Sequence, residues 1–163
     1  MAFILSAQRD EDCGAAFKNY EQYLAEKRDL FPPGARRLIN SDWYFTFFNQ
    51  APHDAWLESI AISESPSIVG EAQRSVSITI RLLAACHDGH IEFHYPRVVR
   101  YSLESGNNSP NHGDWRYDEF RLSDDGYLIH EIEWWNRGPG TWLIESDDVE
   151  YRWVPSNTGI TSA

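Results

Sequence analysis

From residue 114 to residue 154 the chain alternates apolar and polar residues, and turn residues interrupt the alternation three times. Successive side chains of a β-strand point to opposite faces, so a period of two is typical of strands with one face on a core. The turn signals are rich in Asp, Gly, Asn and Pro and occupy residues 124–126, 136–140 and 146–148. The segment therefore predicts a β-meander with an acidic outer surface.

The beginning of the chain has a different period. Phe17, Tyr20 and Leu24 recur at helical spacing and predict a helix over residues 12–28. The Pro-Pro-Gly sequence at 32–34 ends this helix, because proline cannot continue one. Proline suits a first helical turn, so a short second helix is expected at 35–39.

Three further strands are predicted between the helices and the meander, at residues 56–62, 76–82 and 91–95. Pro96 interrupts the last of them, which predicts a bulge or an edge strand there. The aromatic run at 43–48 predicts a fully buried strand, although its periodicity also permits a short buried helix.

Short connections between successive strands favour antiparallel pairing. The predicted fold class is therefore α+β: an N-terminal helix packed on a mostly antiparallel meander sheet of six to eight strands. We expect one domain over residues 1–154 and a flexible tail over 155–163, where residues are small and polar.

The chain has 163 residues and a formal net charge of −11. Its hydrophobic content of 42% supplies enough apolar surface for a core and argues against disorder. An acidic protein is repelled by phosphate backbones, which disfavours nucleic-acid binding, whereas the same charge attracts a basic protein. The alternative is that the charge only keeps an aromatic-rich domain in solution.

The two cysteines, Cys13 and Cys86, show no spacing motif and are expected to be reduced thiols. No apolar stretch is long enough to span a bilayer, and the first five residues are too few for a signal-peptide core. We therefore expect a cytoplasmic protein with no membrane partner.

Several histidines stand beside acidic residues at predicted turns, and His130 lies on a predicted strand. Imidazole and carboxylate groups build metal sites and acid–base pairs, but they also stabilise turns by local hydrogen bonds. A metal-assisted hydrolase or a small-ligand-binding protein is the alternative function that these residues permit. The candidate residues are His53, Asp54, His87, His112 and His130.

His130 shares a strand face with Leu128, Ile132 and Trp134. It is expected to be a core residue that needs a polar partner, and the functional alternative makes it a ligand or base with Glu119 or Asp118.

Glu131 and Glu133 could serve glycoside hydrolysis, but acids at i and i+2 of one strand approach a bond from the same side. Trp134 and Trp135 must point to opposite faces, which favours a sheet covered on both sides over an exposed aromatic patch. The sequence also lacks a phosphate loop, a nucleophile elbow, a Cys-x-x-Cys pair and a His-Glu-x-x-His motif. No catalytic residue and no cofactor are therefore predicted.

Four short phrases, at residues 52–58, 87–89, 112–119 and 129–134, together resemble small uncharacterised bacterial β-rich proteins with a His-Asp entry to the first strand. Some of those proteins look like immunity proteins of toxin systems, and the resemblance spans residues 43–153. It implies a cytoplasmic binder that neutralises a partner by occupying its surface.

The first function hypothesis is thus a non-enzymatic protein-binding module, of the immunity-inhibitor type, that docks on a basic partner through its acidic, aromatic strands. The predicted aromatic anchors are Trp135, Trp142 and Tyr151, and the predicted steering acids are Glu131, Glu133, Glu145 and Glu150. A further possibility is an apolar-ligand cavity between helix and sheet, lined by Trp43, Phe45 and Phe47.

Overall fold

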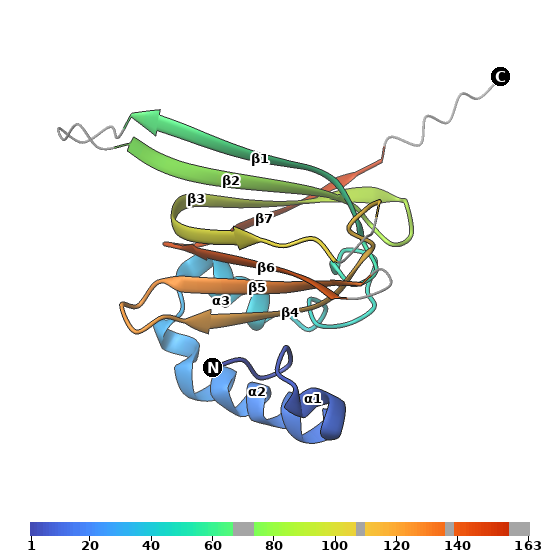
Figure 1. Cartoon of the computed structure of the whole chain (residues 1–163), viewed down its shortest axis with the longest axis vertical. Helices are drawn as coiled ribbons and strands as arrows, with labels where there is room; N and C mark the ends of the chain where they lie inside the picture. The colour runs from blue at the N-terminus through green and yellow to red at the C-terminus, as the bar shows by residue number, and fades with distance from the viewer. Residues whose placement is uncertain (67–73, 107–109, 136–138, 157–163) are drawn as a thin grey trace.

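The computed structural model describes residues 1–66, 74–106, 110–135 and 139–156, and it confirms the predicted α+β class (Figure 1). Its helices are α1 (Gln8–Glu11), α2 (Cys13–Lys27), the 3-10 turn η1 (Arg28–Leu30) and α3 (Pro33–Ile39). Its strands are β1 (Trp56–Pro66), β2 (Arg74–Leu83), β3 (Gly89–Leu103), β4 (Asp114–Leu122), β5 (Leu128–Trp135), β6 (Pro139–Ser146) and β7 (Glu150–Pro155). The predicted tail begins at the last residue of β7, and most of it, 157–163, lies outside the described residues.

The seven described strands form one antiparallel sheet in the order β2-β1-β4-β5-β6-β3-β7. Since β2 also pairs with β3, the pairing runs through six strands and returns to its start. The joint between β1 and β4 is the sparsest, with Trp56 opposite Asp114 as its one ladder pair among the described residues. Alternate side chains of the sheet form the core, as the period of two predicts. Fully buried examples are Ile78, Ile80, Leu82, Ile91, Phe93, Trp115, Phe120, Ile132, Trp134 and Ile144.

The predicted meander is correct for β4, β5 and β6 but wrong for the last strand, because β7 pairs with β3 instead of β6. The connection before β7 makes other bonds that prevent a hairpin. The backbone N–H of Asp147 donates to the carbonyl of Arg97 at 3.0 Å. The Asp148 carboxylate accepts from the backbone N–H groups of Gly34 and Ala35 at 2.8 and 3.0 Å, and so caps α3.

β3 changes partners along its length. Its first half pairs with β2 and β7, and its second half pairs with β6. The β2–β3 register shifts between Tyr95 and Val98, around Pro96, and Figure 1 shows the strand curving back at this point. The bulge predicted from Pro96 is therefore confirmed.

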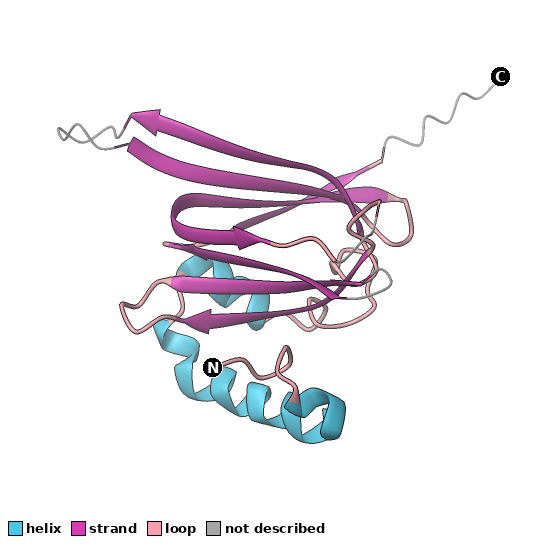
Figure 2. Ribbon diagram, in the orientation of Figure 1, coloured by secondary structure: helices cyan, strands magenta, loops and turns pink. Residues whose placement is uncertain are grey.

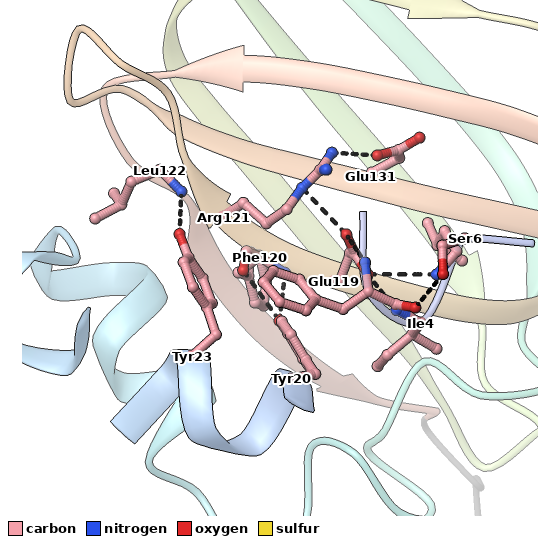
Figure 3. Close-up of polar contacts among 11 residues, drawn as sticks. Ile4, Ser6, Tyr20, Tyr23, Glu119, Phe120, Arg121, Leu122 and Glu131 are labelled. Atoms are coloured by element: carbon pink, nitrogen blue, oxygen red, sulfur yellow. Dashed lines mark hydrogen bonds and ion pairs between the residues drawn. The ribbon is translucent and has the colours of Figure 1, made fainter. Parts of the chain in front are cut away.

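Figure 2 shows α1 and α2 along the outer edge of β4. An open edge exposes backbone donors and acceptors, and two tyrosines of α2 satisfy them here (Figure 3). The Tyr20 hydroxyl accepts from the N–H of Phe120 at 2.6 Å and donates to its carbonyl at 3.1 Å. The Tyr23 hydroxyl accepts from the N–H of Leu122 at 2.9 Å. The helix thus closes the sheet edge with hydrogen bonds as well as with apolar contact.

The strand predicted at 43–48 is wrong, because this segment consists of turns. The Ser41 hydroxyl accepts from the N–H of Tyr44 at 3.2 Å, and the Thr46 hydroxyl donates to the carbonyl of Trp43 at 2.6 Å. Such local bonds compete with extended structure. Of the aromatic residues in the run, Tyr44 is buried in the core, whereas Phe47 is 83% exposed.

Candidate functional site

The histidines and the aspartate proposed as a metal site do not form one metal-binding cluster in the described part of the chain. Among the described residues, no group of three or more His, Cys, Asp or Glu is arranged to hold a metal ion. His53 lies 3.1 Å from the carboxylate of its neighbour Asp54. His87 packs edge-on against Trp56, with the ring centroids 4.8 Å apart. Asp54 and His87 both have a positive φ, of 61° and 56°, which is consistent with the turn role considered for such residues.

His130 is fully buried in a satisfied polar network. Its Nε2 lies 3.0 Å from Oδ2 of Asp118, and its Nδ1 lies 2.7 Å from the hydroxyl of Tyr95. Burial and the nearby Asp118 charge raise the pKa of Tyr95 well above its ordinary value, so this phenol is the proton donor. The histidine then accepts at Nδ1 and donates at Nε2 to the carboxylate. His130 is therefore a core residue whose partner comes from the neighbouring strand.

Three of the four predicted steering acids have partners within the chain. We call Glu131, Glu133 and Glu145 the acidic band. Glu131 pairs with Arg121, and Glu133 lies 3.2 Å from a guanidinium nitrogen of Arg9. Glu145 lies 3.0 Å from a guanidinium nitrogen of Arg100, its cross-strand neighbour on β3. Each acid of the band thus has an ion-pair partner inside the fold, which weakens its attraction for a basic partner protein. Glu150, the fourth acid, is exposed on β7 and lines a shallow hollow.

Arg121 has a second acidic partner, Glu119, which stands directly opposite Glu131 on the adjacent strand. Glu119 is fully buried and also accepts hydrogen bonds from the backbone N–H groups of residues 3–5 (Figure 3). Burial raises the pKa of Glu119 above its ordinary value, although Arg121 and these N–H groups oppose the shift. This carboxylate fastens the start of the chain to the sheet.

Two of the three predicted aromatic anchors face inward. Trp142 is only 1% exposed, so its prediction as a surface anchor is wrong. Tyr151 is half-buried beside Trp43, with ring centroids 5.2 Å apart, and its hydroxyl donates to the carbonyl of Gln50 at 2.7 Å. Because Tyr151 stands opposite the buried Phe93, it belongs to the core face.

Trp135, the third predicted anchor, is 50% exposed while its neighbour Trp134 is fully buried. The prediction of a sheet covered on both faces is therefore wrong at this position. Asp114 stands opposite Trp135 on β4, and Trp56 stands opposite Asp114 on β1. Directly opposed residues on neighbouring strands share a face, so the three side chains form one row across the sheet. We call it the Trp–Asp–Trp row.

Every member of the Trp–Asp–Trp row is accessible. Trp56 is 50% exposed, like Trp135, and Asp114 is also exposed. No ion pair or side-chain hydrogen bond found among the described residues involves the Asp114 carboxylate. Two indoles therefore flank one carboxylate that has no ion-pair partner in the described part of the chain.

The row borders a hollow of about 470 Å³, which is lined by Trp56, Leu57, Asn111, His112, Gly113, Asp114 and Trp135. Burial lowers the pKa of His112 below its ordinary value of 6.5, since its ring packs against two buried indoles. The imidazole is therefore neutral at neutral pH, and Asp114 carries the charge of the hollow. The arrangement suits a cation that can stack on an indole and pair with a carboxylate.

Sequence reasoning found Trp135 but missed Trp56 and Asp114. Each begins its strand, and each follows a turn or loop signal, which is where binding residues concentrate. Their meeting depends on the long-range joint between β1 and β4, which a local pattern does not reveal.

None of the helices in the described part of the chain is long and apolar enough to cross a membrane. Searches with protein-family models, curated proteins and solved structures found no match to this chain. The candidate site is therefore identified from its geometry alone.

Proposed function

We propose that the protein is a non-enzymatic binding module that docks on a basic partner protein through the Trp–Asp–Trp row. The observation that carries the proposal is the register that places an exposed carboxylate, unpaired as far as the described residues extend, between two exposed tryptophans. Such a row would bind a lysine or arginine side chain of the partner protein.

Both contacts of that side chain would be favourable. A guanidinium or ammonium group is attracted to an indole face, and tryptophan is the strongest aromatic partner for a cation. The same group would form a charge-assisted hydrogen bond with Asp114. Tryptophan is also among the residues that contribute most to binding at protein interfaces.

The overall charge favours the same kind of partner. A net charge of −11 raises the local concentration of a basic protein and speeds its encounter with the row. In the cell the proposed role is that of an immunity-type inhibitor, which acts in the cytoplasm by covering a basic surface of its target.

The test compares baits in one affinity purification from a lysate of the source organism. The baits are the wild type, Trp56→Ala/Trp135→Ala, Asp114→Asn and Glu150→Gln. Glu150→Gln is the matched control, because it removes the same charge from an exposed acid outside the hollow. Quantitative mass spectrometry then measures each captured protein.

We expect the wild type and Glu150→Gln to retain a basic protein equally. We expect Trp56→Ala/Trp135→Ala and Asp114→Asn to lose it. If the same proteins remain bound to all four baits, the row is not the docking surface. If the bound proteins depend equally on Glu150 and Asp114, the binding is a non-specific effect of net charge.

A further inference from the structure

A second hollow, of about 280 Å³, lies where α2, the 43–53 segment and the start of β4 meet. Its lining is mostly aromatic and consists of Ile4, Phe17, Tyr44, Phe45, Thr46, Phe47, Pro52, His53, Trp115, Arg116, Tyr117 and Asp118. Two residues of the cavity predicted from the sequence, Phe45 and Phe47, line this hollow. Trp43 does not, because its ring packs against Tyr151. The hollow shares no residue with the one at the Trp–Asp–Trp row.

The buried carboxylate of Asp118 belongs to this lining, and the residue is only 7% exposed. Its Oδ1 accepts from the indole N–H of Trp115 at 3.0 Å. Its Oδ2 accepts from the Tyr44 hydroxyl at 2.8 Å and lies 3.0 Å from Nε2 of His130. Three donors from three separate segments thus hold the carboxylate in place.

The charge of Asp118 has no compensating arginine or lysine among the described residues. The Tyr44 phenol that donates to it stays protonated, because burial and the Asp118 charge raise its pKa well above the ordinary value. A carboxylate has about four acceptor positions, of which these bonds occupy three. The carboxylate therefore has one acceptor position left for a further hydrogen-bond donor, and a carboxylate favours a positive donor, although Arg116 also lines the hollow.

The outer walls include aromatic rings, and the guanidinium groups of Arg9 and Arg116 lie over one of them, Tyr117. Phe45 is 42% and Phe47 83% exposed, and the Phe47 ring packs edge-on against His53 with the centroids 4.4 Å apart. Tyr117 and Phe17 form another edge-on pair, at 6.2 Å. Aromatic walls around a single acceptor fit a flat ring that carries a donor.

From this combination we infer that the hollow is a binding site for a small aromatic amine, with the ring between the aromatic walls and the ammonium group on Asp118. The volume of about 280 Å³ suits a ligand with a single ring or with two fused rings. This site is independent of the proposed docking surface, and either can exist without the other.

The test uses tryptamine as the probe and indole-3-propionate as its partner of opposite charge, because the two share the same ring. Binding is followed by ¹H–¹⁵N NMR at the Trp115 indole signal, since that N–H donates to Asp118. We expect saturable binding of tryptamine with a dissociation constant of about 0.1–1 mM, and at least about tenfold weaker binding of the acid.

Two neighbouring phenylalanines provide a matched pair of variants. Phe47→Ala removes a wall of the hollow, whereas Phe48→Ala removes a ring that is 53% exposed and does not line it. We expect Phe47→Ala to weaken tryptamine binding about five- to tenfold and Phe48→Ala to leave it unchanged. Asp118→Asn should abolish the preference for the amine over the acid. Should that variant not fold, the phenylalanine pair and the two ligands still decide the outcome.

No saturable shift with tryptamine would overturn the inference. Tighter binding of indole-3-propionate would also overturn it, because that result would identify Arg116 at the hollow, and not Asp118, as the charged contact. An equal loss of affinity in Phe47→Ala and Phe48→Ala would place the ligand outside the hollow and contradict the inference as well.

Discussion

The acidic band and the Trp–Asp–Trp row both contain carboxylates, yet they differ in whether the described part of the chain supplies a cation to pair with them. Glu133 of the band and Trp135 of the row are two positions apart on β5. The carboxylate of Glu133 is paired with Arg9, whereas the carboxylate beside Trp135 has no such partner among the described residues. A run of acids and aromatics in the sequence therefore does not by itself make a docking surface. Its partners inside the fold decide whether each acid stabilises the protein or remains available for binding.

Removing both indoles of the row should produce the largest effect. In the Trp56→Ala/Trp135→Ala variant we expect affinity for the basic partner to fall at least about 100-fold, because interface tryptophans dominate binding energy. The free energy of unfolding should change by no more than about 1 kcal/mol, since both side chains are half exposed. Calorimetric titration and chemical denaturation measure the two quantities. A loss of stability as large as the loss of binding energy would mean that the row is structural.

The band should show the opposite pattern. Glu133→Ala removes the closer acidic partner of Arg9 in a site where the Glu133 and Arg9 side chains are only 10% and 14% exposed, and leaves Arg9 with the exposed Asp10. We expect the free energy of unfolding to decrease by about 1–3 kcal/mol, with affinity for the partner unchanged. Glu150→Ala, at an exposed acid, is the control and should change stability by less than about 0.5 kcal/mol. Equal denaturation midpoints for the two variants would show that the band does not stabilise the fold.

The central carboxylate of the row should act mainly on the association rate. In Asp114→Asn we expect association with the basic partner to slow about five- to tenfold and to depend less on salt. Stopped-flow measurements between low and high ionic strength provide the comparison, with Glu150→Gln as the equal-charge control. If both variants slow association to the same extent, total charge and not the row directs the encounter.

A smaller effect is expected from pH. The pKa of His112 is lowered in the folded protein, so its stabilising contribution is present above about pH 6.5 and is lost as the pH falls through the folded-state pKa. Protonation also adds a positive charge to the hollow of Asp114, which opposes a cationic partner. Affinity should therefore decrease on acidification through this range, and His112→Gln should remove that part of the pH dependence. Isothermal titration at several pH values measures it, and identical profiles for the two proteins would contradict the assignment.

The sequence predicted the parts of the fold that follow from local period. The α2 helix and most of the strands are local patterns, and alternation placed Ile78, Ile80 and Leu82 on one buried face. Alternation also indicates that Trp142 shares a strand face with Ile144, whereas Glu145 points to the other face. This shared face identifies Trp142 as a core residue and not as a surface anchor.

Other features depend on contacts between distant segments. The pairing of β7 with β3 depends on the bonds that Asp147 and Asp148 make to other parts of the chain. The row depends on the ladder pair between Trp56 of β1 and Asp114 of β4. Neither of these features has a local signature.

The 43–48 segment is a different case, because its bonds are local. There the side-chain hydrogen bonds of Ser41 and Thr46, each to a residue three positions away, prevail over the aromatic preference for strands.

A ¹H–¹⁵N NMR titration of the protein with a short arginine-rich peptide tests most directly whether the Trp–Asp–Trp row binds a basic partner. The chain has 7 tryptophans, each with its own indole N–H signal, so the exposed pair can be distinguished from the buried ones. We expect saturable shifts of the Trp56 and Trp135 indole signals in the wild type and much weaker binding in Asp114→Asn. Shifts centred on Glu131, Glu133 and Glu145, with the two exposed indoles unmoved, would contradict this expectation.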